Sequence, residues 1–130
     1  MPHLTIEYSA NLETVGDLPM LCLALRAALL STTFFEEGAI RIRAIPCPHY
    51  AVADLAPENG FASLLLRIGA GRSLDDKKRI GAAVMAAAEQ HFATQLARPH
   101  FALSLDILEN DPQLSWKTNA IHSRLRAKKA

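Results

Sequence analysis

The sequence predicts an α+β fold in which duplicated β-α-β units form a four-stranded mixed sheet with two long helices on one face. Segments in which apolar and polar residues alternate, which is typical of strands, flank segments with the apolar spacing of amphipathic helices. This order of strand, helix and strand occurs twice, over residues 1–46 and 61–110. Each unit has the length of a parallel crossover. We therefore predict one two-layer domain over residues 1–130, with a tail over residues 111–130.

The first unit contains two predicted strands and one helix. Residues 4–8 alternate between apolar and polar side chains, which predicts a half-buried strand. Asp17 is placed to cap the helix that follows. One stripe of this helix is apolar and consists of Leu18, Leu21, Cys22, Leu25, Ala28 and Leu29. The second strand is predicted over residues 39–44, with Arg41 and Arg43 on its polar face.

The second unit follows a proline-containing loop over residues 46–60. It begins with an apolar strand over residues 61–68. Ser73 and Asp76 resemble a capping box, which predicts a long helix that ends near Phe92. The last strand is predicted from alternating apolar residues, which are Phe101, Leu103, Leu105 and Ile107. With both helices on one face, the other face of the sheet lacks a cover, so we expect an oligomer.

Composition excludes several classes of protein. Half of the 130 residues are hydrophobic, 21% are charged and the net charge is +1, which is typical of a globular domain. A dedicated nucleic-acid surface needs a concentrated basic field, so we expect no nucleic-acid partner. No signal-peptide pattern or membrane-spanning apolar run is present, which predicts a cytoplasmic protein without a membrane partner. The two cysteines and five scattered histidines lack the spacing of metal ligands, so we expect no metal site.

Pro2 is the residue with the most unusual chemistry. If Met1 is removed, Pro2 presents a secondary amine at the N-terminus, and a neutral amine of this kind is a good general base. Inside the chain, by contrast, a proline has no N–H and its amide nitrogen cannot take up a proton. Many chains begin with Met-Pro for other reasons, so the dipeptide alone does not define a site.

Two arginines are expected near Pro2. Arg41 lies in a strand that is predicted to run parallel to the first, and Arg72 follows a glycine turn at the start of a helix. Arginine holds carboxylates through paired hydrogen bonds and stays charged, so this grouping suits a carboxylate-rich substrate. In the simpler interpretation, Arg41 and Arg43 only form the polar face of a strand, and Arg72 is a solvated loop residue.

Four segments, in the same order along the chain, resemble the 5-carboxymethyl-2-hydroxymuconate delta-isomerases of the tautomerase superfamily. The segments are Pro2 to Asn11, Gly38 to Arg43, Ile68 to Leu74 and Trp116 to His122. The resemblance implies a tautomerase-like fold, a homotrimer and a cofactor-free isomerase of homoprotocatechuate breakdown. The implied reaction moves a proton from the 2-hydroxyl to a chain carbon of a dienol that carries three carboxylates.

The resemblance also implies roles for single residues. Pro2 matches the base, Arg41 and Arg72 match arginines that act on the substrate's carboxylates or developing charge, and Arg43 has a counterpart with a less defined role. The second unit offers no free amine, so we predict one site per chain, with Arg72 supplied by the same subunit or by a neighbour. Residues 44–59 match poorly, which leaves substrate preference open there.

Two other functions fit the same sequence. Other members of the superfamily dehalogenate or decarboxylate small unsaturated or oxo acids. A non-enzymatic ferredoxin-like binding module, in which Pro2 is incidental, is the third possibility. The segment from Trp116 to Asn119 either lines a pocket or docks the tail, and we expect docking, with a short helix in the tail from Trp116.

Overall fold

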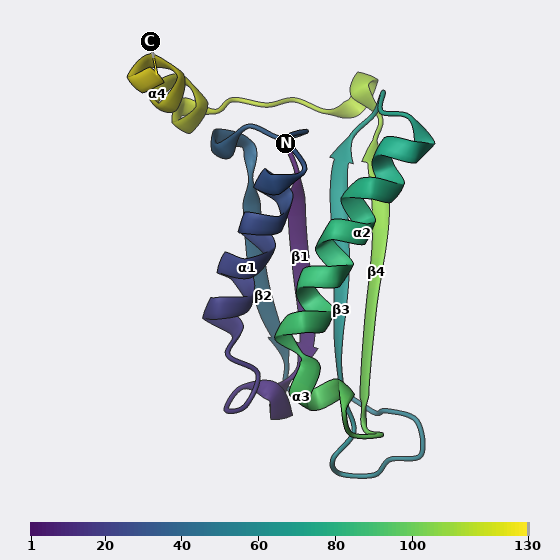
Figure 1. Cartoon of the computed structure of the whole chain (residues 1–130). Coiled ribbons are helices and arrows are strands. Elements are labelled where there is room, and N and C mark those ends of the chain that lie inside the picture. Colours follow the sequence, from purple (N-terminus) through teal and green to yellow (C-terminus); the bar gives the residue numbers. More distant parts are fainter. Residues whose placement is uncertain (130) are drawn as a thin grey trace.

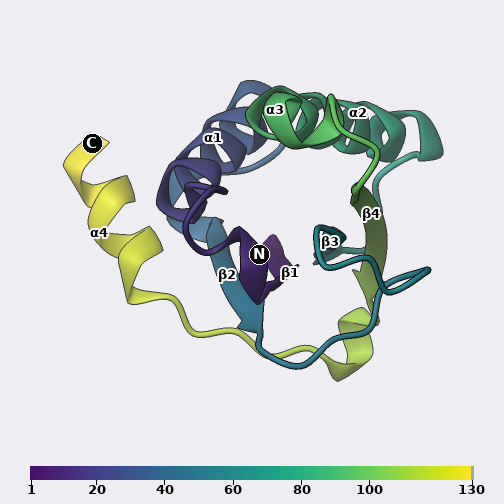
Figure 2. The same cartoon turned by 90° about the horizontal axis from the view of Figure 1, so that it is seen from below.

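Two layers make up the fold in the computed structural model, which describes residues 1–129 (Figure 1). The sheet has the strand order β2-β1-β3-β4, with β1 parallel to β2, β3 parallel to β4, and β1 antiparallel to β3. Figure 2 shows the two long helices side by side over one face of this sheet. The predicted fold class, a mixed four-stranded sheet of duplicated β-α-β units, is therefore confirmed.

The first β-α-β unit consists of β1 (His3–Ser9), α1 (Leu18–Ser31) and β2 (Arg41–Cys47). The Asp17 side chain accepts a hydrogen bond from the Met20 backbone N–H at 3.4 Å, as expected of a helix cap. The expectation that the second strand ends at residue 44 is wrong, because β2 continues through Pro46. A proline is tolerated here because β2 is an edge strand, where a missing backbone N–H does not break the sheet.

The second unit consists of β3 (Gly60–Gly69), α2 (Leu74–His91), the single turn α3 (Ala93–Leu96) and β4 (Phe101–Asn110). Ser73 Oγ accepts a hydrogen bond from the Asp76 backbone N–H at 3.1 Å, so the predicted N-cap of α2 forms. The α3 turn, which was not predicted, follows α2 directly at Phe92.

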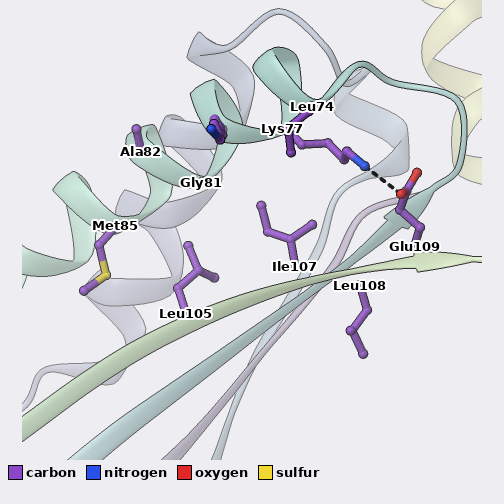
Figure 3. A pocket seen from close by; sticks show the side chains of 10 residues that line it. Leu74, Lys77, Gly81, Ala82, Met85, Leu105, Ile107, Leu108 and Glu109 are labelled. Atoms are coloured by element: carbon purple, nitrogen blue, oxygen red, sulfur yellow. Dashed lines mark hydrogen bonds and ion pairs between the residues drawn. The ribbon is translucent and has the colours of Figure 1, made fainter.

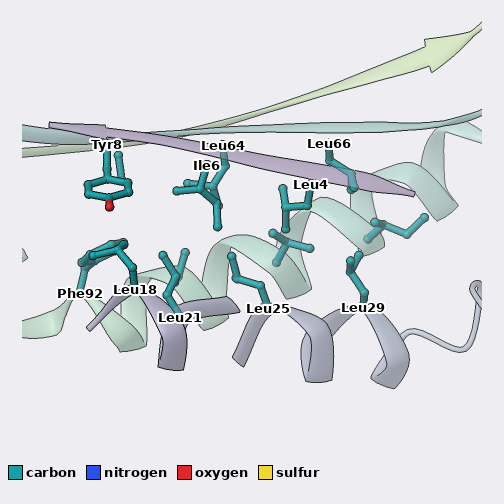
Figure 4. Close-up of a cluster of buried hydrophobic side chains, with 14 of the residues drawn as sticks. Leu4, Ile6, Tyr8, Leu18, Leu21, Leu25, Leu29, Leu64, Leu66 and Phe92 are labelled. Carbon is teal, nitrogen blue, oxygen red and sulfur yellow. The ribbon is translucent and has the colours of Figure 1, made fainter. Parts of the chain in front are cut away.

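The core lies between the helices and the two central strands, as Figure 4 shows. Alternate residues of β1 and β3 point toward the helices, and none of these side chains is more than 3% exposed. The sheet supplies Leu4, Ile6, Tyr8, Leu64 and Leu66, and the helices supply Leu21, Leu25, Leu29, Ile80 and Val84. A shift of one residue in strand pairing would turn polar residues into this core, so burial fixes the register of β1.

The tail after β4 has two parts. Residues 111–119, which we call the strap, include one 3-10 turn and lead into α4 (Ala120–Lys129). Figure 1 shows the strap passing the N-terminus on its way to α4. The helix starts later than the predicted Trp116 because Asn119 Oδ1 accepts from the His122 backbone N–H at 3.0 Å, the contact of an N-cap. Ala130, the last residue of the predicted tail, lies outside the described residues.

Replacement of a buried leucine of α1 should weaken the fold, whereas replacement of an exposed one should not. Leu25 is fully buried, whereas Leu23 on the same helix is 60% exposed. We expect Leu25→Ala to lower the free energy of unfolding by about 2–5 kcal/mol. Leu23→Ala should stay within about 0.5 kcal/mol of the parent in urea denaturation. Equal losses in both variants would contradict the assigned core.

Candidate active site

The N-terminus is fixed at one end of the sheet by pairing on both sides of β1. Pro2 is fully buried, and its carbonyl accepts a hydrogen bond from the Arg41 backbone N–H at 3.1 Å. The next residue, His3, pairs with Arg41 of β2 and with Arg67 of β3. The parallel pairing of β1 and β2 thus places Arg41 beside Pro2, where the sequence led us to expect it.

The guanidinium groups of Arg41 and Arg72 are held by backbone carbonyls. Arg41 Nη1 donates to the carbonyls of Gly38 at 2.9 Å and Ile40 at 3.0 Å. Arg72 Nη2 donates to the Phe34 carbonyl at 3.1 Å, and its Cζ lies 4.7 Å from the centroid of the Phe35 ring. A guanidinium has five N–H donors, so each of these arginines is oriented while other donors remain for an anion.

The amine at the start of the chain has an unusually low pKa. In the structure this amine belongs to Met1, and its pKa falls from 8.0 to about 6. Burial is the largest cause, followed by the charge of Lys117 and its hydrogen-bond contact with the amine, and then by the charges of Arg72 and Arg41. Burial and neighbouring cations both disfavour an ammonium ion. The structure thus groups Arg41 and Arg72 around the terminal amine.

Arg43 contacts His3 rather than the amine. Its Nη1 lies 3.1 Å from His3 Nδ1, and because arginine only donates, His3 accepts at this nitrogen. Burial lowers the pKa of His3, and the charges of Arg67 and Arg43 lower it further. His3 is therefore a neutral group within a cluster of cations at the end of the sheet.

A cavity of about 390 Å³ opens beside Met1. Its lining includes His3, Arg67, Trp116 and Lys117, but neither Arg41 nor Arg72. Sequence reasoning did not assign Arg67 or Lys117 to the site. The motif at Trp116 could have indicated Lys117, but we interpreted that motif as a docking segment. Arg67 lies in a predicted strand and has no distinguishing pattern around it.

Asn119 fastens the strap over the start of the chain. Its Nδ2 donates to the Gly38 carbonyl at 2.9 Å and to Met1 Sδ at 3.4 Å. Beyond it, Arg126 forms two hydrogen bonds with the Glu36 carboxylate, at 2.9 and 2.5 Å. Asn119 and Arg126 therefore dock the tail, as expected, but Trp116 is 85% exposed and, with Lys117, lines the cavity instead.

A second cavity, of about 610 Å³, lies between α2 and β4 (Figure 3). Apolar side chains such as Met85, Leu105 and Ile107 line most of it, and Lys77 pairs with Glu109 at 2.7 Å beside it. None of the predicted site residues lines this cavity, so we assign the candidate active site to the amine end of the sheet. Within residues 1–129 no group of three histidine, cysteine or acidic residues is placed to hold a metal ion, and no helix is long and apolar enough to cross a membrane.

Distant structural relatives identify the class of the fold. A solved structure described as a fused 4-OT, in the form of a symmetric trimer, aligns with a TM-score of 0.62 over 89% of this chain and 93% of that chain. A macrophage migration inhibitory factor-like protein from Entamoeba histolytica aligns with a TM-score of 0.65 over 91% of this chain and 96% of that chain. The identities are 19% and 9%, so these similarities show the fold alone. The chain therefore shares the fold of these two proteins.

The chain belongs to the 5-carboxymethyl-2-hydroxymuconate isomerase family, whose model matches residues 2–125. It is 32% identical to a 5-carboxymethyl-2-hydroxymuconate Delta-isomerase of Escherichia coli, over 95% of this chain and 98% of that protein. It is 42% identical to a 5-carboxymethyl-2-hydroxymuconate isomerase of Deinococcus radiodurans R1, with a TM-score of 0.90 over 96% of this chain and 94% of that chain. The predicted family and its isomerase function are confirmed.

The low pKa of the amine should be measurable without any substrate. The pKa is about 6 in the folded chain and 8.0 for an ordinary terminal amine, so between these values the unfolded chain binds more protons. Protonation therefore favours unfolding, and the amine's contribution to stability rises with pH across this window. We expect acetylation of the amine, followed by mass spectrometry, to be half-maximal near pH 6 in folded protein. The same midpoint in folded and urea-unfolded chains would contradict the environment described.

A methyl group at Gly38 should displace the tail. A Cβ at this position would lie 2.9 Å from His122 Nδ1 and 3.1 Å from His122 Cα, whereas a Cβ at Gly69 would meet nothing within 4 Å. We expect trypsin to cleave the tail faster in Gly38→Ala than in the parent, because the contact with α4 is lost. Gly69→Ala is the matched control and should be cleaved at the parent's rate. Unchanged cleavage of Gly38→Ala would show that the tail does not depend on this contact.

Proposed function

We propose that the chain, once Met1 is removed, uses the Pro2 amine as the base that isomerises 5-carboxymethyl-2-hydroxymuconate. The main support is the low pKa of the terminal amine in this part of the fold, because a base must be neutral at the pH at which it works. Pro2 is fully buried next to Arg41, so an amine at Pro2 experiences burial and positive charge as well.

One base carries the proton from the hydroxyl oxygen to a chain carbon. The neutral Pro2 amine takes the proton of the 2-hydroxyl, and the electron pair left on oxygen spreads along the conjugated chain. The resulting ammonium then delivers a proton to a chain carbon, which forms the keto product and regenerates the neutral amine. This sequence balances without a redox partner, so the chemistry needs no cofactor.

Arg41 and Arg72 are proposed to bind substrate carboxylates and to stabilise the charge that develops on the dienolate. Fixed positive groups contribute most where negative charge grows during the reaction, and both guanidiniums are already oriented by carbonyl contacts. Arg72 lowers the pKa of the amine of its own chain, which favours a site supplied by one subunit. Arg43 is proposed as a further substrate-binding residue, since its exposed guanidinium lies beside His3 at the edge of the site.

We further propose a homotrimer in which neighbouring copies cover the open face of the sheet. That face exposes apolar side chains, with Ile45 45%, Leu65 40% and Leu108 51% exposed, and the outer edges of β2 and β4 have no partner strand within residues 1–129. Burial of such a patch favours association. The trimer described for the fused 4-OT supports the same arrangement. We also propose a role in homoprotocatechuate breakdown, which the family resemblance implies, and a location in the cytoplasm.

Loss of the proline amine should remove most of the activity. In Pro2→Ala the small second residue still permits removal of Met1, but the amine becomes primary and loses its rigid ring. We expect kcat for ketonisation of the dienol, followed by ultraviolet absorbance, to fall by about 10² or more, with the circular dichroism spectrum unchanged. Mass spectrometry must show the mature chain in both samples. Full activity in a preparation that retains Met1 would refute the amine-base mechanism.

A further inference from the structure

The cavity beside the amine carries more positive charge than the proposed mechanism uses. Lys117 of the strap and Arg67 of β3 both line it, together with Met1 and His3. Neither Lys117 nor Arg67 forms a salt bridge among residues 1–129, whereas Arg26, Lys77, Arg79 and Arg126 each pair with a carboxylate. Asp111 is the one acid in the lining that the structure describes, so the two cations give the cavity an excess of positive charge.

One acid, Asp111, also lines this cavity. It begins the strap, and its Oδ1 accepts a hydrogen bond from the Gln113 backbone N–H at 2.9 Å, which orients the carboxylate as the cap of the 3-10 turn. Its single negative charge offsets only one of the two cations, and the remaining positive charge attracts an anion into the cavity. The volume, about 390 Å³, lies within the usual range of about 300–1,000 Å³ for sites that take small molecules.

The position of Lys117 is set by the contacts of a nearby residue of the strap. Asn119, two residues further along, is tied to the Gly38 carbonyl and to Met1 Sδ. On the sheet, Arg67 is paired with His3, which places its Cα beside the first residues of the chain. The two cations thus reach the cavity from separate elements, the strap and β3.

We propose that Lys117 and Arg67 form a carboxylate subsite for the carboxymethyl arm of the substrate. This assignment rests on the proposed function. The dienol carries three carboxylates, and Arg41 and Arg72, which do not line this cavity, are assigned to the other two. A charge-assisted contact of this kind discriminates between a dienol that has the third carboxylate and one that lacks it.

Kinetics on two dienols separate the subsite from a general effect on the amine. The substrates are 5-carboxymethyl-2-hydroxymuconate and 2-hydroxymuconate, which is the same dienol without the carboxymethyl arm. We expect Lys117→Met to lower kcat/KM about tenfold more for the first substrate than for the second. Lys117→Arg should recover much of the loss. Lys128→Met, at an exposed lysine of the same tail, should match the parent on both substrates.

The comparison of substrates cancels the other effect of Lys117, which is its influence on the amine. The charged and titratable groups that face the amine are Lys117 and Asp111 of the strap, His3, Arg41, Arg67 and Arg72. Removal of Lys117 raises the pKa of the amine, and this change affects both dienols alike. Equal losses of kcat/KM on both substrates would therefore overturn the subsite and leave Lys117 with an influence on the amine alone.

The binding of unreactive carboxylic acids, measured by calorimetry, tests the subsite without a measurement of activity. The probes are tricarballylate, with three carboxylates, and glutarate, with two. We expect Lys117→Met and Arg67→Met each to weaken the binding of tricarballylate about tenfold, while the affinity for glutarate changes little. If mature parent protein converts neither dienol but shows this pattern, the proposed function fails, and Lys117 and Arg67 form a carboxylate subsite for another anion. If tricarballylate binds these variants as it binds the parent, the subsite is wrong even when the dienol is converted.

Discussion

The burial of β1 between β2 and β3 is the constraint on which the rest of the structure depends. Leu4 and Ile6 are fully buried and Tyr8 nearly so, and every residue from His3 to Tyr8 has a partner on both sides. Chain ends usually fray unless a strand or helix ties them down. Here the core begins at the second residue, so the position of the terminal amine is set by the packing of leucines and isoleucines.

That packing permits an arrangement of charges that is unfavourable by itself. Burial is the largest cause of the low pKa of the amine, and repulsion from Lys117, Arg72 and Arg41 lowers the pKa further. Carbonyl contacts to Gly38, Ile40 and Phe34 offset part of the cost for the two arginines. An anion that enters the site relieves the remaining repulsion, so the cations that help to lower the pKa of the amine also favour substrate binding.

Local patterns in the sequence were sufficient for most of the fold and for part of the site. Alternation and helix caps predict the elements, and the parallel crossover then requires Arg41 to lie near Pro2. The extension of β2 through Pro46 could not be predicted, because it depends on β2 being an edge strand. Lys117 was missed for a similar reason: its place depends on Asn119 and the Gly38 carbonyl, which are 81 positions apart. No local pattern encodes such a contact.

The strap joins the two ends of the chain in one site, and this has a consequence for biosynthesis. The first strand leaves the ribosome long before residues 117–119, so the amine spends the early life of the molecule without its nearest cation. The contact of Asn119 with the sulfur of Met1 also forms only after this interval. The start of the chain is thus free of the strap until synthesis is nearly complete.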